Sequence, residues 1–173
     1  MMTGRRRFVV TGLGLVAGLV VGGGLSGCGF ALRRAPALNF RTVQLVGFKA
    51  HSPLADALRL QINASESTRV VEAPTPAEVL LEALADVRDK GVVASTATGQ
   101  VREIQVRSSL SFVLRTPAGK VLIAKTDIAL SRDMSYSESL ALAKEQEEAL
   151  LYRGMQNDIV AQVMRRLAAV PAL

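Results

Sequence analysis

The chain has 173 residues, and its 21 Lys and Arg residues outnumber its 15 Asp and Glu residues to give a formal net charge of +6. Arg5, Arg6 and Arg7 lie in an N-terminal segment that we expect to be removed, and without these three the 21 basic residues fall to 18, a net charge of +3. A nucleic-acid-binding protein would combine a clustered basic face with aromatic side chains for stacking. This chain has no Trp, two Tyr and scattered arginines, which excludes that class.

Residues 1–27 have the plan of a secretory signal peptide. The three arginines precede an apolar stretch, residues 8–24, that carries no charged side chain, and this order of basic, apolar and small residues is typical of export signals. A signal anchor is the alternative, although the stretch lies at the lower length limit of a membrane span and its glycines weaken a helix. Residues 4–8, Gly-Arg-Arg-Arg-Phe, also resemble a twin-arginine signal, so the general secretory route and the twin-arginine route both remain open.

Leu25-Ser26-Gly27-Cys28 ends this segment and resembles the lipobox of bacterial lipoproteins, in which the cysteine sulfur takes a diacylglycerol. The alternative is a small buried core cysteine. We expect Cys28 to be the lipid-attachment site, with palmitate among its acyl chains, and two or more such chains anchor a protein stably. Gly29 favours the outer membrane, with the protein on its periplasmic side. The mature chain then consists of a lipidated tether, residues 28–40, and a single domain, residues 41–173.

The first half of the domain predicts a helix between strands. Residues 42–48 alternate and are rich in β-formers, which predicts a strand. Ser52-Pro53 is typical of a helix start, with Ser as the cap and Pro at the first helical position, and the apolar spacing that follows predicts a helix to about residue 64. Residues 68–71 fit a short strand. Residues 78–89 fit a helix by propensity, but we interpret them as a strand with one apolar face. That face contains Val79, Leu81, Ala83, Ala85 and Val87.

The second half predicts a hairpin and a long helix. Turns are expected at residues 90–91 and 97–99, around a short segment 92–96, and residues 101–116 alternate strongly, with a bulge expected at Ser108-Ser109. A turn at 117–120 leads to the returning strand, residues 121–131. Residues 139–170 lack Pro, and an apolar stripe predicts one long helix. The stripe consists of Leu151, Met155, Ile159, Val163 and Leu167. These elements predict an α/β two-layer sandwich, with a mixed sheet of about four strands, two helices on one face and a long C-terminal helix.

The residues for catalysis are missing from the sequence. His51 is the only histidine and Cys28 the only cysteine, so a nucleophile with its base and a metal site with several His or Cys ligands are not expected. We therefore predict a protein that is not an enzyme and uses no cofactor. Four basic residues near the strand-to-helix junction could pair with phosphate through charge-assisted hydrogen bonds, although isolated surface cations are more often merely solvated. These residues are Arg102, Arg107, Arg132 and Lys144.

Several segments of the mature chain resemble the LptE family of lipopolysaccharide-assembly lipoproteins. Cys-Gly-Phe-Ala-Leu-Arg at 28–33 is similar to the start of its mature members, and Leu-Ser-Arg at 130–132 with Tyr136 is similar to a later segment. Leu-Ala-Leu-Ala-Lys-Glu-Gln-Glu at 140–147 resembles another segment of the family, and the pattern from Met155 to Leu167 resembles its last helix. The chain departs from the family at 103–105, Glu-Ile-Gln where relatives often have Glu-Tyr-Gln, and at the turn 97–99, which lacks a basic residue found in some members.

The resemblance implies a fold of two helices on a four-stranded sheet and a role as a plug in the lumen of the β-barrel protein LptD, which helps lipopolysaccharide reach the outer leaflet. Lys144 falls on a basic position of the family's motif, which implies contact with lipid A phosphate or core sugars. The alternatives are an accessory lipoprotein of a phospholipid transporter or of a cell-wall synthase, and a periplasmic enzyme.

Overall fold

The computed structural model describes residues 37–73 and 75–172, so the predicted signal peptide, Cys28 and residues 29–36 of the predicted tether lie outside the described residues. Five strands form one mixed sheet in the order β2-β1-β3-β4-β5. The strands are β1 (Thr42–Val46), β2 (Arg69–Val70), β3 (Val79–Ser95), β4 (Val101–Arg115) and β5 (Val121–Ser135). β1 pairs in parallel with β2 and β3, whereas β3, β4 and β5 form an antiparallel meander.

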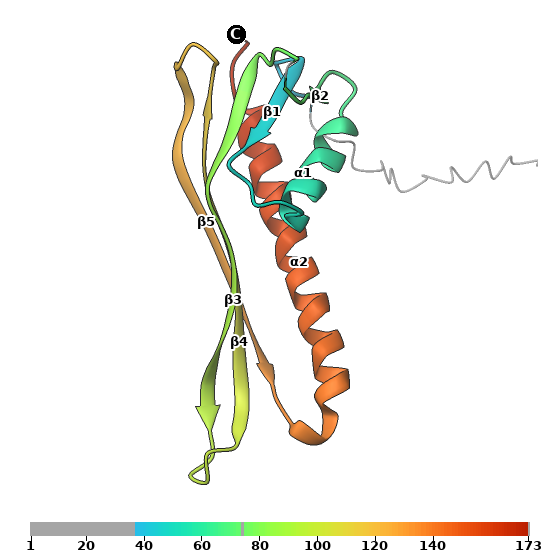
Figure 1. Cartoon of the computed structure of the whole chain (residues 1–173), viewed down its shortest axis with the longest axis vertical. Coiled ribbons are helices and arrows are strands. Elements are labelled where there is room, and N and C mark those ends of the chain that lie inside the picture. Colours follow the sequence, from blue (N-terminus) through green and yellow to red (C-terminus); the bar gives the residue numbers. More distant parts are fainter. Residues whose placement is uncertain (1–36, 74, 173) are drawn as a thin grey trace, which may run out of the picture. The chain divides into compact units, whose positions relative to one another are not determined.

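Both helices lie against the same face of this sheet (Figure 1). They are α1 (Pro53–Asn63) and α2 (Ala141–Ala168), the latter preceded by a 3-10 turn, η1 (Glu138–Leu140). The predicted fold class is thus confirmed, and the strand count rises to five because the short segment at 69–70 pairs with β1 as an edge strand. Within the described residues, no helix combines the length and apolar character that a membrane crossing requires.

α1 starts where the sequence predicts. The Ser52 hydroxyl accepts a hydrogen bond from the Ala55 amide at 3.1 Å, which satisfies one of the amides that a helix start leaves without an intrahelical partner. Pro53 follows at the first helical position, where its missing N–H has no cost. Leu54, Leu58 and Ile62 are buried against the sheet, so the predicted apolar face is the one that packs.

The core lies between the helices and the part of the sheet that contains β1 and the start of β3. Phe112 and Leu114 of β4 are fully buried there, as are Ile159 and Leu167 of α2. Leu38 and Phe40 belong to the same cluster, with exposed fractions of 4% and 3%. The packed core therefore includes residues from the end of the segment predicted as a tether, 28–40.

A β-bulge in β3 changes which side chains of that strand face the helices. Ala83 pairs with Phe112, and Ala85 pairs with the preceding residue of β4, so Leu84 has no partner on β4. One extra residue reverses the alternation of a strand. Before the bulge Val79, Leu81 and Ala83 are buried under the helices. After it Asp86, Arg88 and Lys90 face the helices, which their contacts with α1 and α2 show.

Two expectations for β3 and β4 are therefore wrong. Ala85 and Val87 do not continue the apolar face, and Val87 lies 42% exposed on the opposite side of the sheet. Ser108 and Ser109 form no bulge, because they pair in unbroken register with Arg88 and Val87. The bulge that reverses the alternation of β3 is at Leu84, directly after the pair of Ala83 and Phe112.

β3 also passes through the expected turn at residues 90–91 without interruption. Lys90 pairs with Val106 and Gly91 with Gln105, so the strand continues to Ser95 because β4 supplies a partner along its whole length. The turn expected at 97–99 is present, closed by a hydrogen bond from the Gly99 amide to the Thr96 carbonyl at 2.9 Å. The hairpin at 117–120 is present too.

α2 confirms the predicted long helix and its apolar stripe. Met155, Ile159, Val163 and Leu167 are buried, and Leu151 is half-buried in a second, smaller cluster around Val106. The first half of α2, which is rich in charge, also lies over the sheet. It is held there by this cluster and by polar contacts with β3.

Candidate functional site

A group of polar contacts, which we call the polar seam, joins β3 to the first half of α2. It consists of Arg88, Asp89, Lys90, Glu148 and Tyr152. Lys90 Nζ donates to Glu148 Oε2 at 2.8 Å, and the Tyr152 hydroxyl donates to the Asp89 carbonyl at 2.6 Å. The Arg88 guanidinium lies over the Tyr152 ring, 4.1 Å from its centroid, a distance at which a cation is attracted to the ring.

The electrostatics of the polar seam favour the protonated forms of both titrating groups. The hydrogen bond that Lys90 donates to Glu148 raises the pKa of Lys90 above its ordinary value, against a smaller effect of partial burial. Burial raises the pKa of the Tyr152 hydroxyl, and the nearby Glu148 carboxylate raises it further. At neutral pH the seam is thus an ion pair next to a neutral phenol.

Sequence reasoning missed the polar seam. The alternation from Val79 to Val87 places Arg88 and Lys90 on the solvent-facing side of an uninterrupted strand. The bulge at Leu84 has no distinctive residue, such as a Gly in the left-handed region. Only the paired register shows it.

Lys144 lies in the first turn of α2 and already has two partners. Its Nζ donates to Glu147 Oε2 at 2.7 Å and to Ser135 Oγ at 2.9 Å, and its side chain is only 15% exposed. The lysine predicted to contact phosphate is therefore held between the last residue of β5 and the next turn of α2. An incoming anion would have to displace or share the Glu147 carboxylate.

Arg102 lies at the same end of the domain as Lys144. Its carbonyl accepts a hydrogen bond from the Tyr136 amide at 2.8 Å, next to the Ser135 that Lys144 contacts. Arg102 is exposed, and it lines a shallow hollow of about 260 Å³ with residues from the start of β4 and from η1. Ser137, Glu138 and Ser139 complete the opposite side.

Arg132 and Arg107 lie on opposite faces of the sheet. Arg132 is paired with the buried Val106, so its side chain is on the helix-covered face, and it reaches Asp158 on α2 at 3.4 Å. Arg107 follows Val106 on β4 and projects to the other face, where its Nε donates to Gln105 Oε1 at 2.7 Å. The four predicted cations therefore form no single cluster, and only Lys144 and Arg102 share one end.

The face of the sheet opposite the helices carries a shallow hollow of about 310 Å³. Small side chains of β4 and β5, with Val87 and Arg107 at its rim, form it. No described helix or strand covers this face (Figure 1). We call it the open face. It offers small, hydroxylated and charged side chains, which suit association with another protein or a polar ligand.

His51 has no role in a catalytic arrangement among the described residues. It occupies an exposed turn with φ of 59°, a region in which His is enriched over most residues. The neighbouring Ser52 hydroxyl donates to Asp86 while it caps α1. The Ser52 proton is thus directed at the Asp86 carboxylate, and among the described residues no hydrogen bond joins Ser52 to His51.

The chain is similar to a group of bacterial lipoproteins. Residues 40–167 match the family described as LptE, lipopolysaccharide-assembly. The solution structure of an uncharacterized lipoprotein B from Nitrosomonas europaea matches with a TM-score of 0.68 and 26% identity, over 82% of this chain and 91% of that chain.

Two crystal structures share the fold at lower identity. Rare lipoprotein B from Shewanella oneidensis matches with a TM-score of 0.60 and 19% identity, over 75% of this chain and 95% of that one. A minor lipoprotein from Acinetobacter baumannii matches with a TM-score of 0.60 and 16% identity, over 76% and 93%.

Proposed function

The chain belongs to the LptE family of lipopolysaccharide-assembly lipoproteins, and from that premise we propose that it is a lipid-anchored plug of an LptD-like β-barrel. In this proposal residues 1–27 are removed, Cys28 carries the acyl chains, and the domain lies on the periplasmic side of the outer membrane. Its role is binding and assembly rather than catalysis.

Two observations support the proposal. The match covers the described domain almost from end to end, and the fold leaves the long β3–β4–β5 meander covered on one face only. A plug needs a rigid body with an uncovered surface for the barrel wall. The open face is such a surface, and the helices on the other side fix its shape through the core.

Lys144 is the residue we propose for the glycolipid. Its ammonium lies next to Ser135 and Glu147, at the end where Arg102 is exposed. A phosphate that replaces the Glu147 carboxylate would keep the same charge-assisted hydrogen bond. Arg107 and Arg132 are not adjacent to this position, so we assign them to the open face and to the contact with Asp158.

The barrel proposal is tested by recovering the tagged chain from solubilised outer membranes of its native host. We expect an LptD-like barrel in stoichiometric amounts, and mass spectrometry should find a mature N-terminus at acylated Cys28. A free monomer in mild detergent would contradict the plug role. Recovery of a transport ATPase complex or of a penicillin-binding protein would instead support the accessory roles in phospholipid transport or cell-wall synthesis.

A further inference from the structure

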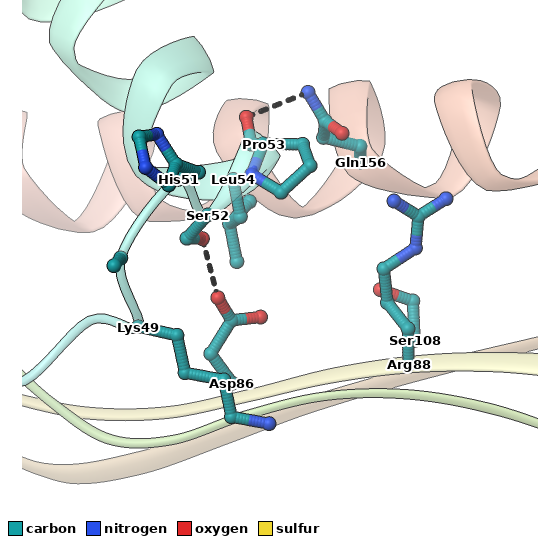
Figure 2. Close-up of a pocket in the computed structure, with 10 residues that line it drawn as sticks. Lys49, His51, Ser52, Pro53, Leu54, Asp86, Arg88, Ser108 and Gln156 are labelled. Carbon is teal, nitrogen blue, oxygen red and sulfur yellow. Dashed lines mark hydrogen bonds between the residues drawn. The ribbon is translucent and has the colours of Figure 1, made fainter.

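A cleft lies between the start of α1, the middle of β3 and the centre of α2, away from Lys144. Its cavity has a volume of about 210 Å³. Figure 2 shows the side chains around it, with Asp86 and Arg88 rising from the sheet below and Pro53 and Gln156 above. Its lining includes Asp86, Arg88, Ser108 and Gln156.

Two hydrogen-bond donors at the cleft have no acceptor among the described residues. The Arg88 guanidinium lies over the Tyr152 ring, a contact that leaves its N–H donors available for a carboxylate. Ser108 is only 6% exposed, yet its hydroxyl forms no hydrogen bond with another described residue. The hydroxyl lines the cleft, so a ligand there could accept a hydrogen bond from it.

Two acceptors complement these donors. Asp86 uses one carboxylate oxygen, Oδ2, to accept the Ser52 hydroxyl, and its other oxygen has no donor among the described side chains. The Gln156 side chain donates Nε2 to the Pro53 carbonyl at 3.0 Å, which fixes the amide and directs its own oxygen away from that bond. The cleft therefore presents both donors and acceptors, fixed by contacts outside it.

This combination selects a ligand with one acidic group and several hydroxyls. A bare inorganic anion would pair with Arg88 but lacks the ring hydroxyls that could donate to both Asp86 and Gln156. A neutral sugar would satisfy Asp86 and Gln156 and leave the Arg88 charge without a partner. We propose that the cleft binds a sugar acid, with the carboxylate on Arg88 and Ser108 and the ring hydroxyls on Asp86 and Gln156.

The proposal goes beyond the role of Lys144 and does not need the barrel. Lys144 contacts the last residue of β5, whereas the cleft lies beside the start of α1. An acidic sugar of a glycolipid headgroup could occupy it, and so could a free sugar acid. Because the purified chain should bind the ligand alone, failure here is distinguishable from failure of the plug role.

The test uses the full mature lipidated chain, ¹⁵N-labelled in detergent micelles, titrated with glucuronate, glucose and inorganic phosphate at equal concentrations. We expect glucuronate to shift the side-chain resonances of Arg88 Nε–H and of the Gln156 amide, and to bind more tightly than glucose or phosphate. Arg88→Gln should weaken glucuronate binding about tenfold or more, the effect of losing a hydrogen bond to a charged group. Arg107→Gln, an equal charge change on the open face, should leave it unchanged.

Ser108→Ala provides a second variant that leaves the contact between Arg88 and Tyr152 intact. It should weaken glucuronate binding several-fold while the unfolding midpoint is maintained. Three results would overturn the proposal: no shifts at the cleft with glucuronate, glucose binding as tightly as glucuronate, or phosphate binding as tightly as glucuronate. The last would indicate a site for bare anions.

Discussion

Tyr152 on α2 and Asp89 on β3, 63 residues apart in sequence, are joined by a hydrogen bond of 2.6 Å from the phenol to the backbone carbonyl. β1 pairs with β3 only as far as Glu82, so this part of β3 is at an edge of the sheet. The tyrosine thus attaches the helix to a strand edge that no described strand covers.

Tyr152→Phe should lower the free energy of unfolding by about 1 kcal/mol, because it removes one hydrogen bond and retains the ring under Arg88. Urea denaturation followed by circular dichroism measures the difference. Tyr136→Phe is the matched control, since the Tyr136 hydroxyl donates to no described residue, and it should change stability much less. Equal effects of the two substitutions would contradict the role assigned to the Tyr152 bond.

High pH should weaken the polar seam. Lys90 and Tyr152 both have a raised pKa in the folded chain, so the folded state retains protons that the unfolded state loses. Their contribution is complete below the ordinary pKa values of 10.5 for Lys90 and 10.0 for Tyr152 and is lost as the pH rises through the raised values. The free energy of unfolding should therefore decrease above a pH of about 10.

The check on this prediction is a series of urea titrations from neutral to strongly alkaline pH, with the double variant Lys90→Gln, Tyr152→Phe alongside. The variant lacks both groups, so its stability should decrease less steeply over the same range. Parallel curves for the two proteins would assign the alkaline loss to other groups.

Glu147→Gln should increase the affinity for lipopolysaccharide about two- to five-fold, because it removes the carboxylate that shares the Lys144 ammonium, and a partly exposed ion pair is worth up to about 1 kcal/mol. Lys144→Gln should decrease the affinity. Binding is measured with fluorescently labelled lipopolysaccharide in detergent. Glu145→Gln is the control, because it makes the same change in net charge two residues before Glu147. An equal gain in affinity from that variant would mean that Lys144 is not involved.

Gly47 follows β1 with φ of 77°, and a Cβ there would clash with the Ala83 carbonyl oxygen. Gly47→Ala should therefore destabilise the domain by more than about 1 kcal/mol, the cost of the left-handed backbone alone. Gly119→Ala separates the two causes, because Gly119 has φ of 90° but open space around it. Thermal unfolding midpoints compare them, and a Gly47 variant as stable as the Gly119 variant would show that the clash relaxes at no cost.

Much of the fold follows from local sequence signals. Ser52-Pro53 specifies the start of α1, and the apolar stripe from Leu151 to Leu167 specifies α2 and its buried side. The alternation along 101–116 identifies β4. Each of these patterns is set by residues close together in the chain, so no knowledge of the pairing is needed.

The bulge at Leu84 could not be predicted, because it is a relation between β3 and β4 rather than a pattern within either strand. Its consequence is large, since it turns Arg88 and Lys90 toward α2 and creates both the polar seam and one wall of the cleft.

The anion site at Lys144 could be predicted only from the residue type. Its existing partners, Glu147 and Ser135, become visible only in the folded chain.

The central claim is that the open face lies against a β-barrel, and photo-crosslinking tests it most directly. A photoreactive amino acid in place of Arg107, introduced in the native host, should yield on irradiation one heavier adduct whose mass spectrum contains peptides of an LptD-like barrel. The same cells kept dark should yield none. An adduct with a transport ATPase or a penicillin-binding protein, or no protein adduct at this position, would contradict the account.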